Sequence, residues 1–135
     1  MRVRSRLRRA AAAVELAVLL PFLMFLFVLA VDWSRVFYDS VIVTNCARNG
    51  ALYACDPTTQ ASSPYANVTE AALADASNLS PPPTVTSTQG SDANGSYVEV
   101  TVTYQFQTVS NFPGVPKTTT VVRTVRMNVL PQNPN

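Results

Sequence analysis

The chain has 135 residues, of which 47% are hydrophobic and 13% charged. That length suits a single domain or a membrane anchor that carries a small one, and the charged fraction is about half the globular average of roughly 25%. There is no histidine and there are only two cysteines, which excludes most zinc sites, Ser/His/Asp and Cys/His nucleophilic sites, and any disulfide-dense scaffold.

Residues 1–10 form a basic leader. Half of the Lys and Arg residues of the chain lie there, with no acid among them: Arg2, Arg4, Arg6, Arg8 and Arg9. A run of arginines can indicate nucleic-acid binding, but directly before an apolar segment it sets membrane orientation and keeps the N-terminus in the cytoplasm. We therefore expect no nucleic-acid partner, and we expect residues 32–135 to lie on the periplasmic or extracellular side.

Residues 11–31 are predicted to form a transmembrane helix. All of these residues except Glu15 and Pro21 are apolar. At about 1.5 Å per residue the segment spans about 31 Å, which matches a hydrocarbon core of about 30 Å. The buried helix of a soluble protein is rarely so apolar on every side. The lipid bilayer is therefore the first expected partner of the chain.

Three kinds of membrane-directed segment fit this pattern. A secretory signal would be cleaved after Val28-Leu29-Ala30, although the apolar run is longer than an ordinary signal sequence. A plain signal anchor would stay uncut. The third is a prepilin-type leader, and this interpretation depends on Glu15. An acid at the centre of a membrane helix costs roughly 2.5–3.5 kcal/mol, and less near the interface, so its presence needs an explanation. Glu15 either reaches the headgroups, is protonated, or meets a cation inside the membrane.

Residues 32–56 are predicted to extend this helix outside the membrane. Asp56-Pro57 ends it, because the residue before a proline avoids α geometry, so a helix over 11–55 would be about 67 Å long. Trp33 and Tyr38 suit the membrane–water boundary. Apolar or small residues recur at three- and four-residue spacing and predict the face that packs on a head: Trp33, Phe37, Val41, Thr44, Ala47, Ala51 and Ala54.

Two motifs on either side of the span resemble one known family. The first is Ala13-Val14-Glu15-Leu16-Ala17 with Leu20-Pro21, and the second is Thr44-Asn45-Cys46-Ala47-Arg48-Asn49-Gly50-Ala51 with Tyr53-Ala54. Together they resemble the TadE-like minor pseudopilins of tight-adherence pili. The resemblance covers about the first 55 residues, and beyond them it rests on general architecture.

The resemblance implies a structural or assembly component of a tight-adherence (type IVc) pilus, and not an enzyme. The implied location is the bacterial inner membrane, crossed once, with the N-terminus in the cytoplasm. The implied partners are other pilins or pseudopilins, the inner-membrane pilus assembly machinery and a prepilin peptidase.

The resemblance also implies roles for single residues. Prepilin peptidase would cut between Ala10 and Ala11, with Ala10 in the place where these peptidases generally take glycine. Glu15 would then be the fifth residue and would pair, inside the membrane, with the new amine of a neighbouring subunit. Pro21 removes one backbone donor, so the helix is expected to kink or loosen before it.

Cys46 and Cys55 are nine residues apart. On one helix their Cα atoms would be about 13.5 Å apart and on opposite faces, whereas a disulfide needs them within about 7 Å. A disulfide between them would require the helix to break before Cys55. A bond to another chain and burial as free thiols are the alternatives, and we favour free thiols.

Residues 57–135 are predicted to form a small head. Asn67 with Glu70 three residues later resembles a capping box and starts a short helix to about Asn78. Strands are expected over 84–88, 98–106 and 121–129, with a turn over 90–95. A three-stranded sheet of this size needs a helix to cover its apolar face. The expected fold is therefore α+β and pilin-like, with a long N-terminal helix packed against a three-stranded antiparallel sheet.

No residue pattern in the sequence indicates catalysis, a cofactor or a metal site. Besides a pseudopilin, two other functions fit the membrane segment and the head. One is a bitopic membrane protein whose outer domain binds a ligand or an envelope partner without any filament. The other is a secreted domain released by cleavage after Ala30.

Overall fold

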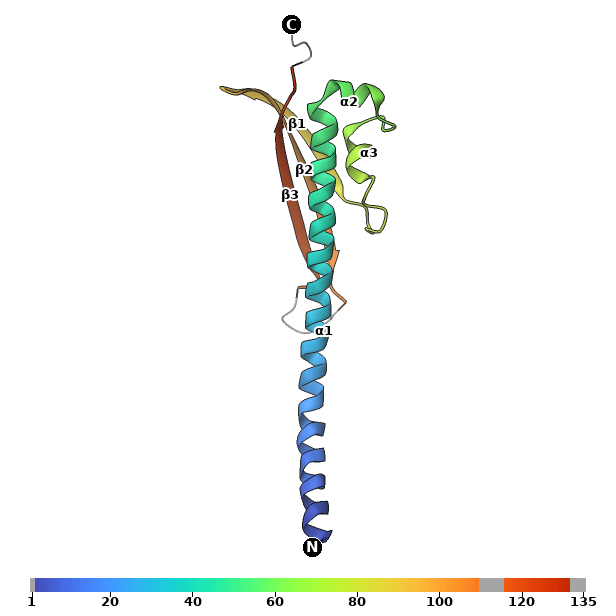
Figure 1. Cartoon of the computed structure of the whole chain (residues 1–135), viewed down its shortest axis with the longest axis vertical. Coiled ribbons are helices and arrows are strands. Elements are labelled where there is room, and N and C mark those ends of the chain that lie inside the picture. Colours follow the sequence, from blue (N-terminus) through green and yellow to red (C-terminus); the bar gives the residue numbers. More distant parts are fainter. Residues whose placement is uncertain (1, 110–115, 132–135) are drawn as a thin grey trace.

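In the computed structural model the chain begins with one helix of 54 residues, α1 (Arg2–Cys55). The structure describes residues 2–109 and 116–131, with the side chains of residues 11 onward except that of Thr59. The rest of the described chain lies along the C-terminal half of α1, so the molecule is a rod with a head at one end (Figure 1). The predicted helix over 11–55 is confirmed.

Three strands form an antiparallel sheet in the order β1-β2-β3. Their bounds are Thr84–Asp92 for β1, Gly95–Gln107 for β2 and Thr118–Asn128 for β3. The central strand pairs with β1 from Gly95 to Thr103 and with β3 from Tyr97 to Gln107, with Val85 opposite Val102 on one side and Val100 opposite Val125 on the other. The sheet packs on the upper half of α1, and the predicted α+β fold is confirmed.

The first strand is longer than predicted, and the turn after it is shorter. The expected turn over 90–95 is reduced to Ala93 and Asn94, followed by Gly95 at φ 110°. Gly90 is part of the strand, and a Cβ atom there would lie only 2.5 Å from the Tyr97 ring. This glycine therefore makes room for a neighbouring ring, a role that glycine also has inside strands.

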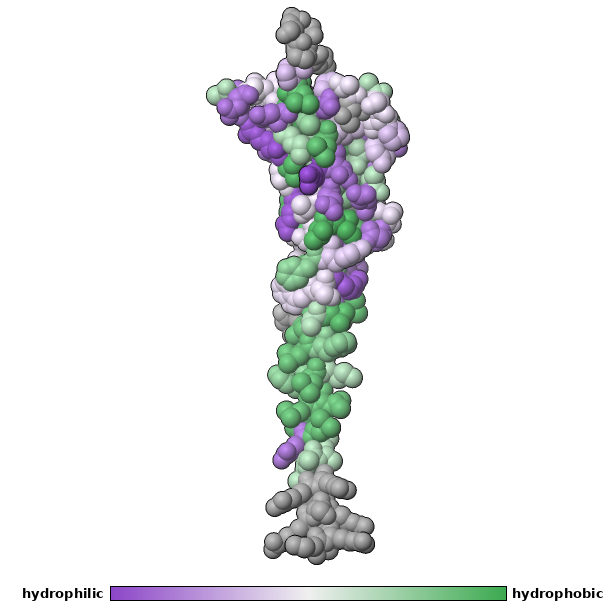
Figure 2. All heavy atoms as spheres, viewed as in Figure 1, coloured by the Kyte–Doolittle hydropathy of each residue, from purple (hydrophilic) through white to green (hydrophobic). Residues whose placement is uncertain are grey.

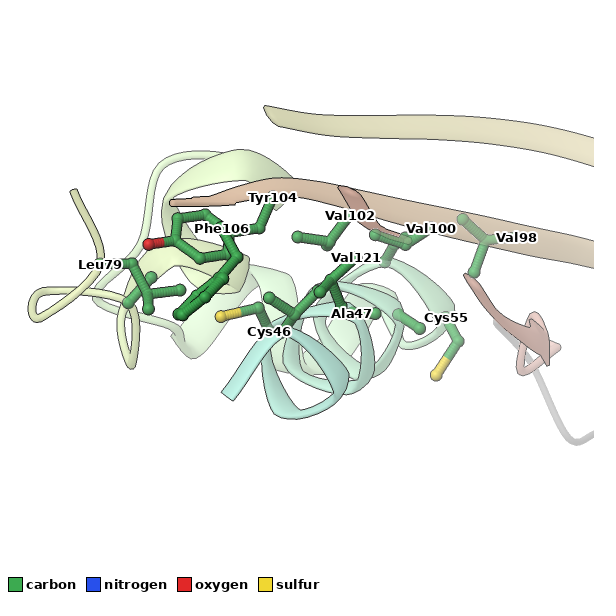
Figure 3. Packing of buried hydrophobic residues seen from close by; sticks show 14 residues of the cluster. Cys46, Ala47, Cys55, Leu79, Val98, Val100, Val102, Tyr104, Phe106 and Val121 are labelled. Atoms are coloured by element: carbon green, nitrogen blue, oxygen red, sulfur yellow. The ribbon is translucent and has the colours of Figure 1, made fainter. Parts of the chain in front are cut away.

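The core between β2 and α1 follows the alternation seen in the sequence. Every second residue of β2 is buried: Val98, Val100, Val102, Tyr104 and Phe106. Figure 3 shows these side chains in a row above α1, with Cys46 beside Phe106. On the helix, a Cβ atom at Gly50 would lie 3.0 Å from the Ala72 Cβ and 3.1 Å from the Val100 Cγ1. Small residues on α1 thus allow the helix to approach the sheet closely.

The face of α1 that packs on the sheet was predicted wrongly in its first half. Ala47, Ala51 and Ala54 are buried, as expected. Thr44, Trp33, Phe37 and Val41 are exposed instead, the last three to 62%, 67% and 59%. In their place the helix buries Asp32, Val43 and Cys46. The prediction followed the largest apolar side chains, whereas close packing on the sheet selects small ones.

A short helix that was not predicted follows α1 directly. α2 (Pro57–Ser62) begins at Asp56, whose side chain accepts a hydrogen bond of 2.9 Å from the Thr58 backbone N–H. Pro57 occupies its first turn, where a missing N–H costs nothing. Asp56-Pro57 therefore ends one helix and starts the next, a signal that was present in the sequence.

The capped helix of the head begins where it was predicted and ends earlier. α3 (Val68–Leu73) starts at Asn67, whose Oδ1 accepts from the Glu70 N–H at 2.8 Å, and Glu70 in turn accepts from the Ala66 N–H. It ends at Leu73 rather than near Asn78. Two turns follow, closed by the bonds Ala76 N–H to Leu73 O and Leu79 N–H to Ala76 O. They bring Ala76 and Leu79 into the core.

Candidate functional site

The part of α1 between residues 11 and 31 has almost no contact with the rest of the described chain. Its large side chains are exposed, Phe27 to 65% and Val18 to 72%. The helix is long and apolar enough to cross a membrane, by length and composition. Figure 2 shows a largely hydrophobic surface over this part of the rod and a mixed, more hydrophilic surface over the head.

The residues singled out near the N-terminus lie within this helix. The backbone of α1 is helical across the Ala10–Ala11 bond and continues through Pro21 without interruption. Glu15 is exposed on the apolar part of the rod. The structure thus places a carboxylate one turn after the expected cut, on a surface that the head does not cover.

Beyond residue 31, an apolar stripe remains exposed on α1 beside the face that packs on the sheet. Trp33, Phe37 and Val41 follow one another at four-residue spacing, so they form a single row on the helix. The rings of Trp33 and Phe37 lie 6.2 Å apart. The row continues the uncovered apolar surface of the lower helix into the level of the head.

The base of the head is fixed to α1 by a buried acid that the sequence did not reveal. Asp32 is 5% exposed, and its Oδ1 accepts a hydrogen bond of 3.1 Å from the Val109 backbone N–H. Arg35 lies 4.0 Å from the same oxygen and above the Phe106 ring. A mainly apolar cavity of about 150 Å³ adjoins this contact, between Leu29 and Pro116. An aspartate directly after an apolar run carries no sequence signal for burial.

A second polar contact joins α1 to the sheet. Arg123 interrupts the apolar face of β3, and its Nη2 lies 2.5 Å from the Ser40 Oγ. The guanidinium also donates to the Val122 carbonyl oxygen. This arginine therefore reaches the helix through a polar side chain at the edge of the core.

The two cysteines are free and buried. Cys46 faces the core, and Cys55 lies at the far end of the buried cluster, where the Leu130 N–H donates to its carbonyl oxygen at 2.8 Å. Burial is the main cause that raises the pKa of both thiols, with Asp75 adding to it for Cys46 and Asp56 for Cys55. A thiol with a raised pKa is a poor nucleophile at neutral pH. Both cysteines therefore act as small core residues in this structure.

Within residues 2–109 and 116–131, no three His, Cys, Asp or Glu side chains lie close enough together to hold a metal ion. What the described chain does offer is a set of surfaces: the uncovered lower helix with Glu15, and the exposed row from Trp33 to Val41.

The comparison with protein families gives a match for most of α1. A family described as TadE-like protein matches residues 10–52. Residues 10–52 are TadE-like. This confirms the resemblance seen in the two sequence motifs. The TadE-like segment covers about a third of the chain and lies entirely within α1, so the sheet and the two short helices are outside it.

No curated protein and no solved structure matches the chain. The TadE-like segment begins at the residue before the expected cut and ends at Leu52, near the end of α1. It therefore contains Glu15, Pro21 and the exposed row from Trp33 to Val41. It also contains most of the small residues that face the sheet.

Proposed function

We propose that this chain is a TadE-like pseudopilin, a structural or assembly component of a tight-adherence (type IVc) pilus in a bacterial inner membrane. The observation that carries the proposal is the TadE-like match over residues 10–52. It coincides with a helix whose apolar half is left uncovered by the rest of the described chain. The proposal includes no catalytic activity.

The arrangement of α1 supports a single crossing of the membrane. Residues 11–31 would lie in the bilayer, with the arginines of residues 1–10 on the cytoplasmic side. Trp33 and Tyr38, both 62% exposed, would then lie at the outer boundary, where aromatic residues with a polar atom are favoured. The head would stand on the periplasmic or extracellular side.

Assembly would use the surface that the head leaves free. Other pilins or pseudopilins, or the inner-membrane assembly machinery, would pack against the lower helix and the row Trp33, Phe37 and Val41. Glu15 would supply the polar contact within this apolar surface. Prepilin peptidase would cut between Ala10 and Ala11, and the new amine of one subunit would pair with Glu15 of its neighbour.

The first experiment determines the N-terminal residue of the protein purified from its native membrane. A mature chain that starts at Ala11 is the expected result. A chain that keeps Met1 would contradict the processing step and favour a bitopic protein with a binding domain. A chain that starts at Val31 and is found in the soluble fraction would overturn the proposal in favour of a secreted domain.

The second experiment replaces Glu15 with alanine. We expect the variant to insert in the membrane at the normal level, because removing a carboxylate from an apolar helix makes insertion easier, and to lose most surface pili. Glu99→Ala, on the outer face of the sheet, is the matched control and should assemble pili normally. If Glu15→Ala cells assemble normal pili, the proposed pairing is wrong.

A further inference from the structure

A hollow of about 300 Å³ lies on the head between α1 and the segment that carries α2 and α3. The helix contributes Asn49, Leu52 and Tyr53, while the connection to α3 contributes Tyr65 and the residues after α3 contribute Asp75. Figure 1 shows α3 lying alongside the upper part of α1, at the head end of the rod.

The walls of this hollow are held in place by the protein itself. The Asn49 amide donates to Asp75 Oδ2 at 2.7 Å, which orients the carboxylate. The Tyr53 hydroxyl donates to the Tyr65 backbone oxygen at 3.1 Å, and the Tyr65 N–H donates to Ser63 Oγ. The first two of these contacts connect residues that are 26 and 12 positions apart in the chain. The Asp75 carboxylate and the Tyr53 ring are therefore oriented before any ligand arrives, which lowers the entropic cost of binding.

The chemistry of the hollow is that of a cation site. Its lining holds two phenol rings and one carboxylate, and none of the lining residues is lysine or arginine. Arg48 precedes Asn49 in the chain but does not line the hollow. A carboxylate is an acceptor with room for several hydrogen bonds, and one amide donor leaves Asp75 with acceptor capacity. Aromatic faces attract a guanidinium or an ammonium within about 6 Å of the ring centroid.

The same head shows how such a pair of groups holds an arginine. On the outer face of the sheet, the Arg126 guanidinium lies over the Tyr97 ring, 3.5 Å from its centroid, and forms an ion pair with Asp92. One tyrosine ring and one carboxylate thus contact the same guanidinium on this surface. The hollow at Asp75 presents the same two groups, with a second tyrosine, and is lined by no cation.

We propose that this hollow binds an arginine side chain presented by another protein. The guanidinium would lie against Tyr65 or Tyr53 and donate to the Asp75 carboxylate, with the Leu52 side chain covering the aliphatic part. Arginine fits better than lysine because its planar group can stack on a ring and donate two parallel hydrogen bonds at the same time. The proposal concerns the head alone and does not depend on the pilus role or on the processing of the N-terminus.

The test is a titration of the full-length ¹⁵N-labelled chain in detergent micelles, followed by NMR. N-acetyl-arginine amide is the probe, and N-acetyl-citrulline amide, which has the same shape without the charge, is its control. We expect saturable shifts at the backbone amides of Tyr53, Tyr65 and Asp75, with half-saturation on the order of 1 mM for so small a ligand. The citrulline probe should bind at least about tenfold more weakly.

Two variants separate the proposed contact from general effects. Asp75→Asn keeps an acceptor for Asn49 but removes the charge, and it should weaken arginine binding by at least about tenfold. Glu99→Gln removes one negative charge from the outer face of the sheet and should leave binding unchanged. Tyr65→Leu, which retains the backbone oxygen that Tyr53 uses, should weaken binding even if Asp75→Asn fails to fold. Equal shifts with citrulline, unchanged binding in Asp75→Asn or Tyr65→Leu, or no saturable shift at all would each overturn the proposal.

Discussion

The two halves of α1 belong to one continuous helix, yet they differ in the size of their apolar side chains. Between residues 11 and 31 the helix carries leucine, phenylalanine and methionine, and most of these side chains are exposed. Between residues 43 and 54 the buried residues are small: Val43, Cys46, Ala47, Gly50, Ala51 and Ala54. Both halves are hydrophobic, so hydrophobicity alone does not say where the helix contacts its own head.

The size difference has a physical origin. Where a helix packs closely on a sheet, short side chains let the two backbones approach, and the atoms in contact gain dispersion energy. A helix surrounded by lipid has no such constraint, and large side chains cover its backbone and fill the surrounding hydrocarbon. The upper half is therefore expected to be sensitive to the volume of a side chain, and the lower half is expected to tolerate changes in volume as far as the stability of the head is concerned.

The largest expected difference comes from removing the same side chain in the two regions. Phe106 is 1% exposed and packs on the upper half of α1, so Phe106→Ala should destabilise the head by about 3–5 kcal/mol. Phe27→Ala removes a ring from the lower half and should leave the stability of the head unchanged. Urea unfolding of the full chain in micelles, followed by near-UV circular dichroism, measures both. Similar losses in the two variants would mean that the lower helix is part of the same folding unit.

A volume increase on the upper half tests the comparison from the other direction. Gly50→Leu would force atoms into the space between Ala72 and Val100, and overpacking of this kind costs about 1–3 kcal/mol. The better helix propensity of leucine offsets up to about 1 kcal/mol of that loss. Val41→Leu, on the exposed face of the same helix, is the control and should be neutral. The same urea experiment applies, and a Gly50→Leu variant more stable than the control would contradict close packing at this position.

The junction between the two halves should respond to a smaller change. Asp32→Asn keeps an acceptor for the Val109 N–H but makes the bond neutral, and charged hydrogen bonds are worth about 1 kcal/mol more than neutral ones. We expect hydrogen exchange of the Val109 amide to become about fivefold faster. Asp92→Asn, at the other end of the sheet, should leave this amide unaffected. Unchanged exchange in Asp32→Asn would show that this contact does not hold the base of the head to α1.

Much of this fold was predictable, because the decisive residues act locally. The long helix follows from an unbroken apolar and then amphipathic run that ends at Asp56-Pro57, and β2 follows from strict alternation over Val98 to Phe106. The helix cap at Asn67 could be predicted for the same reason, because its partner Glu70 is only three residues away. The TadE-like segment was identified from two short motifs, and the family match covers both of them except Tyr53-Ala54 at the end of the second.

What could not be predicted depends on contacts between distant segments. The burial of Asp32 depends on Val109, which is 77 residues away along the chain. Which face of α1 packs on the sheet depends on the side-chain size that the sheet can accept. Trp33 and Phe37 were therefore wrongly predicted to lie on the packed face. The hollow at Asp75 joins residues from α1 and from the segment around α3. None of these contacts produces a periodic or short-range pattern in the sequence.

The smallest expected effect is electrostatic and lies at the edge of the upper half. Burial raises the pKa of Asp39, and the nearby Arg35 offsets this only in part. A carboxyl whose pKa is raised on folding destabilises the folded state at pH values above that pKa, and the penalty vanishes below the pKa of the unfolded chain. Asp39→Asn should therefore be slightly more stable than the original chain at pH 7, by less than about 1 kcal/mol because solvent screens the partly exposed group.

The pH dependence distinguishes this electrostatic cause from a change in shape. If the charge of Asp39 is responsible, the stability advantage of Asp39→Asn over the original chain must shrink as the pH falls toward the ordinary range of a carboxyl pKa, because both side chains are then neutral. Urea unfolding of both chains at neutral and acidic pH measures this difference. An advantage that stays constant with pH would come from packing or hydrogen bonding instead, and one that grows at low pH would mean that Arg35 outweighs burial at this site.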